Sequence, residues 1–423
     1  QKLLWTATRS LKGALWEAES GKLIGKLAGG KQVDNPYFTE DGSRLYVSLR
    51  EQGGSIVGLS TETGEAVTPV MPVQNRIDRG RYHVGSKVDG QVRVLLDDPQ
   101  SRQLLLWDGE SGEQIALPGG AQVPLQQRHY GLSRDHRYVY AAYVDKTVSV
   151  WSSGDGSAVV AASQHGLALS QIGMSPDSKW VVMASQVDQA VAWLPVGTAE
   201  TAATKVQRID LGFPLRSFFF HPQESVVVVV GRTAEQGLVK VVNLETAEVV
   251  TSISQDKLSG SNNRAMNGFG YLGLKRGVLG RWMIGMVSHE RRQYGVWDLA
   301  SGKEIQRFQF ADSQLKNVKF TSDGGRVVST HEDNTLRIWD LFSGRPLTDP
   351  IEHPWVPEVT VTDDGEKLIT VNSGDKAVRV FSSRTGELLV EPHTFPDAYP
   401  VKFRQLQDRN QILHINVMDV SIG

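Results

Sequence analysis

The sequence contains no cysteine among its 423 residues. This absence excludes disulfide bonds, thiolate metal ligands, cysteine nucleophiles and covalently attached c-type haem. An apolar run long enough to cross a bilayer is also missing. The longest such stretch, "SVVVVVG" from Ser225, has the length and the β-branching of a buried strand. We therefore expect no membrane insertion.

An excess of charge of either sign is missing as well, because the formal net charge is −2 at pH 7. The chain lacks the interleaved aromatic and basic residues that are typical of nucleic-acid binding, so we expect no nucleic-acid partner. The sequence does not establish the cellular compartment of the protein, although the cytoplasm is slightly favoured. The chain begins at Gln1 rather than Met, which is compatible with a removed signal peptide or with a piece of a longer protein.

Helical periodicity is absent, and a hairpin pattern recurs nine times instead. Each copy is a short alternating strand, a turn and a second short strand, which is typical of β-structure. The clearest copy is "HEDNTLRIWDLFSGRPL", His331–Leu347. Its glycine tolerates the positive φ that a tight hairpin needs. The other copies begin at Gly13, Ser55, Leu104, Thr147, Ala190, Val239, Tyr294 and Ala377.

A second pattern keeps step with the hairpins. Polar turns that contain Asp, such as "SPDS" ending at Ser178 and "TSDG" ending at Gly324, join two further strands in each unit. Four strands that recur roughly every 40 to 55 residues are typical of a propeller blade. We predict an all-β fold, a single closed β-propeller of four-stranded antiparallel blades. Nine repeats are counted, and eight blades are the alternative.

The repeats predict one domain over residues 1–423. Eight full repeats occupy 28–396, and residues 1–27 form the N-terminal part of a closing blade. Residues 397–423 supply the C-terminal strands of that blade, because a ring closed in this way leaves no sheet edge exposed. Two stretches, "KLLWTATR" and "QILHINV", both look like the second strand of a unit, and the sequence does not decide between them.

The copy from Phe320, "FTSDGGRVVSTHEDNTLRIWDLFSGRPL", contains a Ser-Asp-Gly turn, a D-x-T-x-R-x-W-D strand and a Ser-Gly turn. With these features the chain resembles the WD-repeat family of β-propellers over nearly all of its length. "GRPLTDPIEHP" and "GELLVEPHTFP" also resemble repeats of bacterial multidomain signalling proteins. The resemblance implies a ring that binds protein partners, often as a module of a larger protein.

The resemblance also implies buried tetrads of Trp, Ser or Thr, Asp and His that stiffen the blades. One set in the expected order is His165, Ser185, Asp188 and Trp193, and a second is His353, Asp375 and Phe381, in which Phe381 lacks the indole donor. Trp151 and Trp339 have an Asp at the family's spacing but lack the upstream His. Six tryptophans occupy the same slot of six units, and we predict that they point inward: Trp16, Trp107, Trp151, Trp193, Trp297 and Trp339.

Enzymatic motifs do not fit their required contexts. "GFGYLG" from Gly268 matches G-x-G-x-x-G, but a turn and a strand follow it where a dinucleotide fold needs a helix. "SHERRQ" from Ser288 lacks the second His of a zinc-protease helix, and no G-x-S-x-G is present. We predict no enzyme, no catalytic residue, no metal and no cofactor. The alternative is a propeller enzyme, lactonase-like or quinone-dependent, with inward carboxylates at the central channel.

Arginine gathers in the longer loops expected on one face, in "VQNRIDRGR" from Val73, "DDPQSRQ" from Asp97, "QDKLSGSNNRAMNG" from Gln255 and "SHERRQ". Arginine is enriched at interfaces and pairs with carboxylates, so these loops are candidates for a binding surface. The alternative interpretation is that they are merely solvated loops. In "HPWVPE" from His353, Trp355 is either an exposed anchor or wedged between blades. We predict a non-enzymatic scaffold or sensor that binds a protein through Arg76, Arg79, Arg81, Arg102, Arg264, Arg291, Arg292 and Trp355.

Overall fold

The computed structural model is built from β-strands, with one short 3-10 helix, η1 (Leu27–Gly30), among the described residues. It divides into two compact units. Unit 1 comprises Gln1–Ser217 and Asp408–Ile412, and unit 2 comprises Phe218–Gln407 and Leu413–Gly423. The structure describes residues 3–7, 13–17, 23–39, 41–49, 55–73, 82–86, 91–98, 103–118, 129–143, 145–197, 206–221, 225–233, 236–256, 282–288, 293–299, 301–310, 313, 315–321, 323–354, 358–362, 364–372, 375, 377–394, 398–405 and 413–419.

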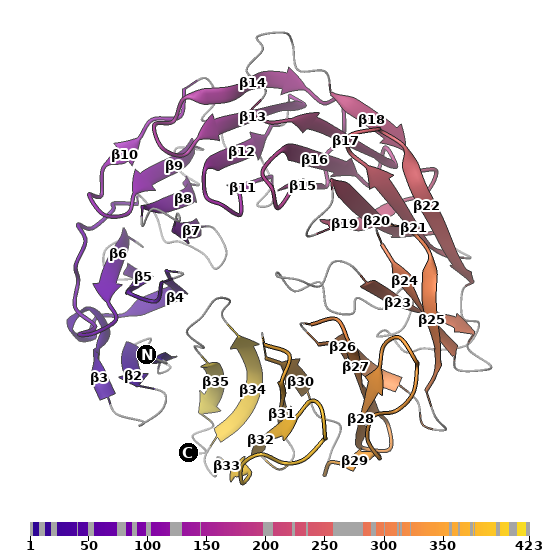
Figure 1. The fold of residues 1–423 in the computed structure, drawn as a ribbon. Coiled ribbons are helices and arrows are strands. Elements are labelled where there is room, and N and C mark those ends of the chain that lie inside the picture. Colours follow the sequence, from indigo (N-terminus) through magenta and orange to yellow (C-terminus); the bar gives the residue numbers. More distant parts are fainter. Residues whose placement is uncertain are drawn as a thin grey trace. The chain divides into compact units, whose positions relative to one another are not determined.

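The described strands before residue 211 form five sheets, in which each strand pairs antiparallel with the next one in the chain (Figure 1). The first two sheets are β1 (Leu3–Ala7), β2 (Gly13–Glu17) and β3 (Leu23–Lys26), then β4 (Val33–Phe38), β5 (Arg44–Leu49) and β6 (Ser55–Ser60). Three four-stranded sheets follow: β7 (Tyr82–Ser86), β8 (Val92–Asp98), β9 (Gln103–Asp108) and β10 (Gln114–Ile115); β11 (Tyr130–Leu132), β12 (Tyr138–Ala142), β13 (Thr147–Ser152) and β14 (Ala158–Gln164); β15 (Gln171–Met174), β16 (Trp180–Ser185), β17 (Ala190–Pro195) and β18 (Gln207–Asp210).

Five further sheets follow the same order. They are β19 (Leu215–Phe220), β20 (Val226–Arg232), β21 (Gln236–Asn243) and β22 (Val249–Asp256); β23 (Trp282–Ser288), β24 (Gln293–Asp298) and β25 (Glu304–Gln309); β26 (Leu315–Phe320), β27 (Arg326–His331), β28 (Thr335–Asp340) and β29 (Ile351–Glu352); β30 (Glu358–Val361), β31 (Lys367–Asn372), β32 (Ala377–Ser382) and β33 (His393–Thr394); and β34 (Ala398–Gln405) with β35 (Leu413–Asp419).

The nine predicted hairpins fall one to a sheet, from β2–β3 to β32–β33. Sequential antiparallel sheets of this size are the blades of a β-propeller, so the predicted fold class is confirmed. The eight sheets from β4 to β33 lie within residues 28–396. Among the described pairings, β34 pairs with β35, and β1 pairs with β2. A closing blade shared by the two ends of the chain stays a prediction.

The polar turns between the first two strands of a blade are held by a repeated hydrogen-bond pattern. In one of them Thr362 Oγ1 donates to Asp364 Oδ1 over 2.5 Å and accepts from the Lys367 backbone N–H over 3.0 Å. The hydroxyl donation holds the pKa of Asp364 below its usual value. The same side-chain bond joins Thr39 to Asp41, Ser133 to Asp135, Ser175 to Asp177 and Thr321 to Asp323.

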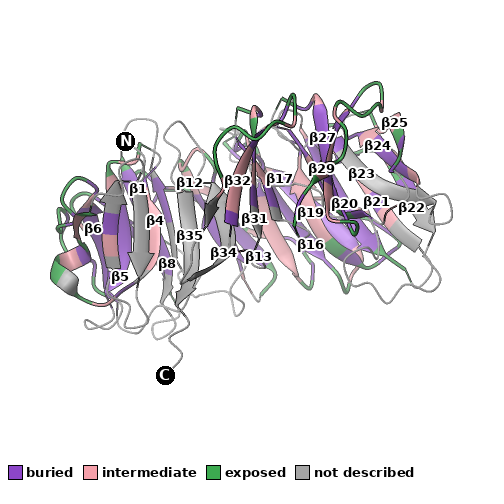
Figure 2. Cartoon of the chain, turned by 90° about the horizontal axis from the view of Figure 1, so that it is seen from below, coloured by how far each residue is buried: buried purple, intermediate pink, exposed green. Residues whose placement is uncertain are grey.

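The core lies between the faces of successive sheets, where the buried residues of Figure 2 are concentrated. In unit 1, Val150 of β13 belongs to one buried cluster with Met183 of β16. In unit 2, Phe308 of β25 and Trp339 of β28 share another cluster. Apolar burial of this kind is the main term that stabilises stacked sheets. Four tryptophans of the predicted inward slot are at most 6% exposed: Trp107, Trp151, Trp193 and Trp339.

The glycine of the outer hairpin packs against the preceding blade. A Cβ atom added at Gly156 would lie 1.9 Å from the backbone oxygen of Ala116, and one at Gly302 would lie 2.3 Å from Thr251 Cβ. Both glycines have positive φ, +75° and +69°. Any larger residue would therefore push neighbouring blades apart as well as straining the turn.

We expect Gly156→Ala to lower the free energy of unfolding by about 2 kcal/mol or more. This loss should be larger than the loss caused by Gly212→Ala. Gly212 has the same φ of +75° but nothing within 4 Å of an added Cβ, so its substitution carries only the backbone strain. Urea unfolding of both variants measures the difference. Equal losses would show that the hairpin does not pack against Ala116.

Candidate interaction site

The residues predicted to bind a partner lie outside the described residues. The segments that flank them are described, however, and show how the turns of the blades are fixed in place. The predicted binding residues that lie outside the described ranges are Arg76, Arg79, Arg81, Arg102, Arg264, Arg291, Arg292 and Trp355.

The segment that leads to Trp355 is anchored by His353. The His353 side chain is 4% exposed, and its Nε2 lies 3.1 Å from Thr370 Oγ1 and 3.5 Å from an Arg379 guanidinium nitrogen. Arg379 in turn donates to Asp375 Oδ2 over 2.5 Å. Burial is the largest influence on Asp375 and raises its pKa, but the Arg379 donation, the Ala377 N–H and the nearby charges together outweigh it, and the net shift is downward. His353 and Asp375 thus share one cluster as predicted, and Arg379 joins them.

The preceding blade contains a buried chain that the sequence did not predict. Trp339 Nε1 donates to Ser329 Oγ over 2.8 Å, and Ser329 Oγ lies 2.8 Å from His331 Nε2. His331 is fully buried, and burial lowers its pKa. The histidine comes from β27 itself rather than from the loop upstream. Its signal in the sequence is the spacing of two between Ser329 and His331, which puts both on one side of a strand.

In the predicted tetrad around His165, three side chains bond the backbone of the segment that follows β14. Ser185 Oγ donates to the Ala168 carbonyl over 2.6 Å, and Asp188 Oδ2 accepts from the Ala168 N–H over 2.5 Å. His165 Nδ1 accepts from the Leu167 N–H over 3.2 Å. These side chains therefore fix the segment that connects β14 to β15.

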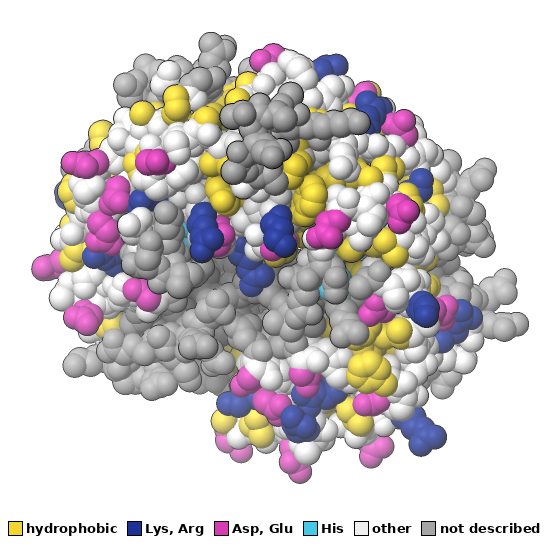
Figure 3. All heavy atoms as spheres, turned by 45° about the horizontal axis from the view of Figure 1, so that its top comes forward, with side chains coloured by type: hydrophobic (Ala, Val, Ile, Leu, Met, Phe, Trp, Pro, Cys, Tyr) yellow, Lys and Arg dark blue, Asp and Glu magenta, His cyan; other side chains and the backbone are white. Residues whose placement is uncertain are grey.

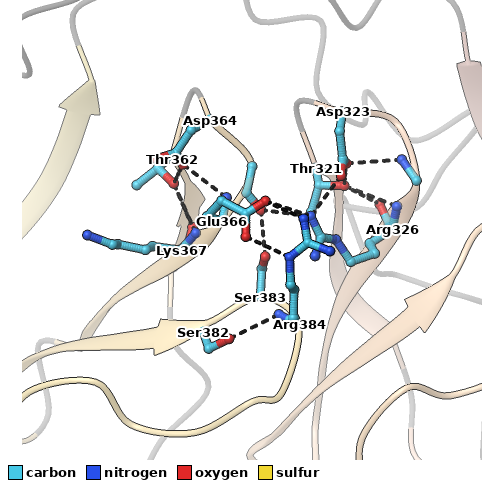
Figure 4. A network of polar contacts seen from close by, with 12 residues as sticks. Thr321, Asp323, Arg326, Thr362, Asp364, Glu366, Lys367, Ser382, Ser383 and Arg384 are labelled. Carbon is cyan, nitrogen blue, oxygen red and sulfur yellow. Dashed lines mark hydrogen bonds and ion pairs between the residues drawn. The ribbon is translucent and has the colours of Figure 1, made fainter.

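At the turns between β26 and β27 and between β30 and β31, two blades of unit 2 are joined by an ionic brace (Figure 4). Arg326, 6% exposed, donates to Asp323 Oδ2 over 2.7 Å and to the Gly365 carbonyl over 3.3 Å. Glu366 accepts two bonds from Arg384, over 2.7 and 2.6 Å, which lower the pKa of Glu366. The opposite charges of the brace pair with one another, so the brace holds the two turns in position.

The described residues on one face of the molecule carry charges of both signs. Acidic and basic side chains are interspersed on the face shown in Figure 3. Within the described ranges, no group of three or more His, Asp or Glu side chains is arranged to hold a metal ion. The carboxylate cluster that would favour a propeller enzyme is therefore not found in this part of the chain.

No helix in the described part of the chain is long and apolar enough to span a bilayer.

The blade that contains Trp339 matches a known repeat. The family model described as "WD domain, G-beta repeat" matches residues 302–340. Nuclear distribution protein nudF of Aspergillus niger is 21% identical over 259 residues, which are 61% of this chain and 49% of that protein. The β-propeller therefore contains a segment that matches a WD repeat. The predicted resemblance is thereby confirmed.

Other comparisons agree on the propeller fold. Autophagy-related protein 16 of Arabidopsis thaliana is 31% identical over 98 residues, 23% of this chain and 19% of that protein. A crystal structure of the eukaryotic initiation factor matches with a TM-score of 0.62 at 11% identity, covering 93% of this propeller and 96% of that chain. Each match to these curated relatives spans less than half of the relative's length, so their activities are not carried over to the propeller.

Proposed function

We propose that the propeller is a non-enzymatic scaffold or sensor module that binds a protein partner through the basic loops on one face. The observation that carries the proposal is the matched WD repeat at 302–340, in a chain whose nine predicted hairpins fall one to a sheet. WD-type propellers present their connecting loops on a rigid scaffold, which is where binding residues usually lie.

The anchored turns support this proposal. His353 and Asp188 each fix a connecting segment by a hydrogen bond, and His331 Nδ1 lies 3.4 Å from the Ser313 carbonyl of another connecting segment. Fixed loops lose little conformational entropy on binding, which favours affinity. Trp355, which follows the anchored His353 in the chain, would supply an apolar anchor, and the predicted arginines of the basic loops would pair with carboxylates of the partner.

The proposal is tested with the immobilised chain and a lysate of its source cell. Mass spectrometry identifies the proteins that are retained by the wild type and by a variant with Arg76, Arg79, Arg81, Arg291 and Arg292 changed to Glu. We expect a partner that the wild type holds and the variant loses. Retention that is identical for both proteins would contradict a binding site on the basic loops.

A control variant separates loop binding from a general effect of charge. It changes four exposed basic residues of the blades to Glu: Arg137, Lys179, Arg208 and Arg307. Their ion pairs are exposed and contribute little to stability, so the fold should persist. We expect the control to retain the partner. Its loss from the control as well would show that net charge, rather than the loops, governs the binding.

A further inference from the structure

Two neighbouring blades of unit 2 expose apolar side chains along their outermost segments. Leu347, Leu388, Leu389 and Val390 are between 43% and 55% exposed. Leu347 N–H bonds the Ile338 carbonyl and Leu389 N–H bonds the Val380 carbonyl, so both segments run beside the third strand of their blade. Both segments lie at the edge of their sheet.

The two segments lie against each other. A Cβ atom added at Gly386 would lie 2.7 Å from Ile351 Cδ1 and 3.1 Å from Thr348 Cγ2. The hairpin that precedes Leu388 therefore rests on the segment that follows Leu347. The four exposed apolar side chains therefore belong to two adjoining segments of neighbouring blades, and clustered exposure of this kind marks interaction sites, whereas single exposed residues do not.

Carboxylates lie on the same two segments. The side chains of Asp349, Glu352, Glu387 and Glu391 belong to exposed residues, and no ion pair joins them to another described residue. Arg345 is the exposed cation on the same segments, since Arg384 is paired with Glu366. The two segments therefore combine exposed apolar side chains with an excess of negative charge.

The backbone of the outer segments does not favour the pairing of a partner strand with this edge. Pro346, Pro350 and Pro392 interrupt the outer segments, and β29 and β33 have only two residues each. Proline removes the N–H donors that an added strand needs and is a common protection of sheet edges. A partner must then bind by its side chains rather than by extending the sheet.

We propose that this acidic rim, formed by Leu347, Leu388, Leu389 and Val390 with Asp349, Glu352, Glu387 and Glu391, docks an amphipathic helix of a partner protein whose apolar face is flanked by Lys and Arg. A helix presents its apolar stripe without needing strand pairing, and its cations complement the four carboxylates. The rim lies on the outer edge of its two blades and would prefer a basic partner, so it is a second candidate surface with the opposite charge preference.

The probe is a synthetic peptide of about 18 residues, roughly five helical turns, with Leu on one face and Lys on the other. Calorimetry measures its affinity for the whole chain. We expect the variant with Leu347→Ser, Leu389→Ser and Val390→Ser to bind at least about tenfold more weakly than the wild type. The variant with Asp349→Asn, Glu387→Gln and Glu391→Gln should bind more weakly and lose most of the salt dependence of binding.

Two controls decide the interpretation. The same peptide with Glu in place of Lys should not bind. Val67→Ser with Val70→Ser, two exposed apolar residues on another blade, should leave the affinity unchanged. Because all substituted residues are exposed, the variants should keep the fold of the wild type. Equal affinity of the serine variant and the wild type, or equal binding of the Glu peptide, would overturn the acidic rim as a docking site.

Discussion

Replacing Trp339 by Ala is expected to lower the free energy of unfolding by about 3–5 kcal/mol, as for other large-to-small changes in a core. The ring is 6% exposed and lies edge-on to Phe310, with ring centroids 5.2 Å apart, and to Phe308 at 6.2 Å. The substitution opens a cavity between β25, β26 and β28 and leaves Ser329 without its indole donor. Urea unfolding followed by circular dichroism measures the loss.

Trp339→Phe is the matched control. Phe381 occupies the corresponding slot of the next blade and is 5% exposed, so a phenyl ring fits this environment. We expect this variant to lose about 1 kcal/mol, mainly the hydrogen bond to Ser329. If the alanine variant melted at the wild-type temperature, the inward placement of Trp339 would be wrong.

The tryptophan slot shows what the sequence could predict. A large apolar residue at the same place in a repeating strand must face the same way in every blade, because side chains alternate across a strand. Trp107, Trp151, Trp193 and Trp339 are accordingly buried. Trp297 is only half-buried, and the side chain of Trp16 lies outside the described residues.

The hydrogen-bond partners of the buried polar groups were harder to predict. Ser185 and Asp188 both bond the backbone of Ala168, which carries no signal in the sequence. Trp151 likewise donates to the Pro118 carbonyl over 3.0 Å. A repeat pattern gives the strand on which a side chain lies, whereas the partner depends on how the connecting segment passes over it.

The acidic rim was missed for a different reason. Leu347 and Leu389 follow the turn glycines in the alternating pattern of a strand, so the sequence indicates a strand with one buried face. Only the position of these segments at the edge of each sheet, with no further strand beside them in the described topology, shows that they are exposed. Local pattern does not distinguish an edge strand from a central one.

The second large effect is expected on acidification. The pKa of His165 is lowered to about 4, mainly by burial, with smaller contributions from the nearby His129 and Lys146 and with Asp145 acting in the opposite direction. Burial also lowers the pKa of His129. The unfolded chain has ordinary histidines, which take up protons near pH 6.5. Between pH 6.5 and about 4 the unfolded state therefore binds more protons than the folded state, and stability falls as the pH falls.

For His165 alone this loss amounts to about 3 kcal/mol by pH 4, and it is absent above pH 7. His165→Asn tests the assignment, because an amide oxygen can accept from the Leu167 N–H in place of Nδ1 but does not titrate. Urea unfolding at a series of pH values should give a flatter profile for the variant between pH 6.5 and 5, where carboxylates stay ionised in both states. At pH 8 the two proteins should differ little. If the stability of the variant fell as steeply as that of the wild type, protonation of His165 would not be the cause of the loss of stability at low pH.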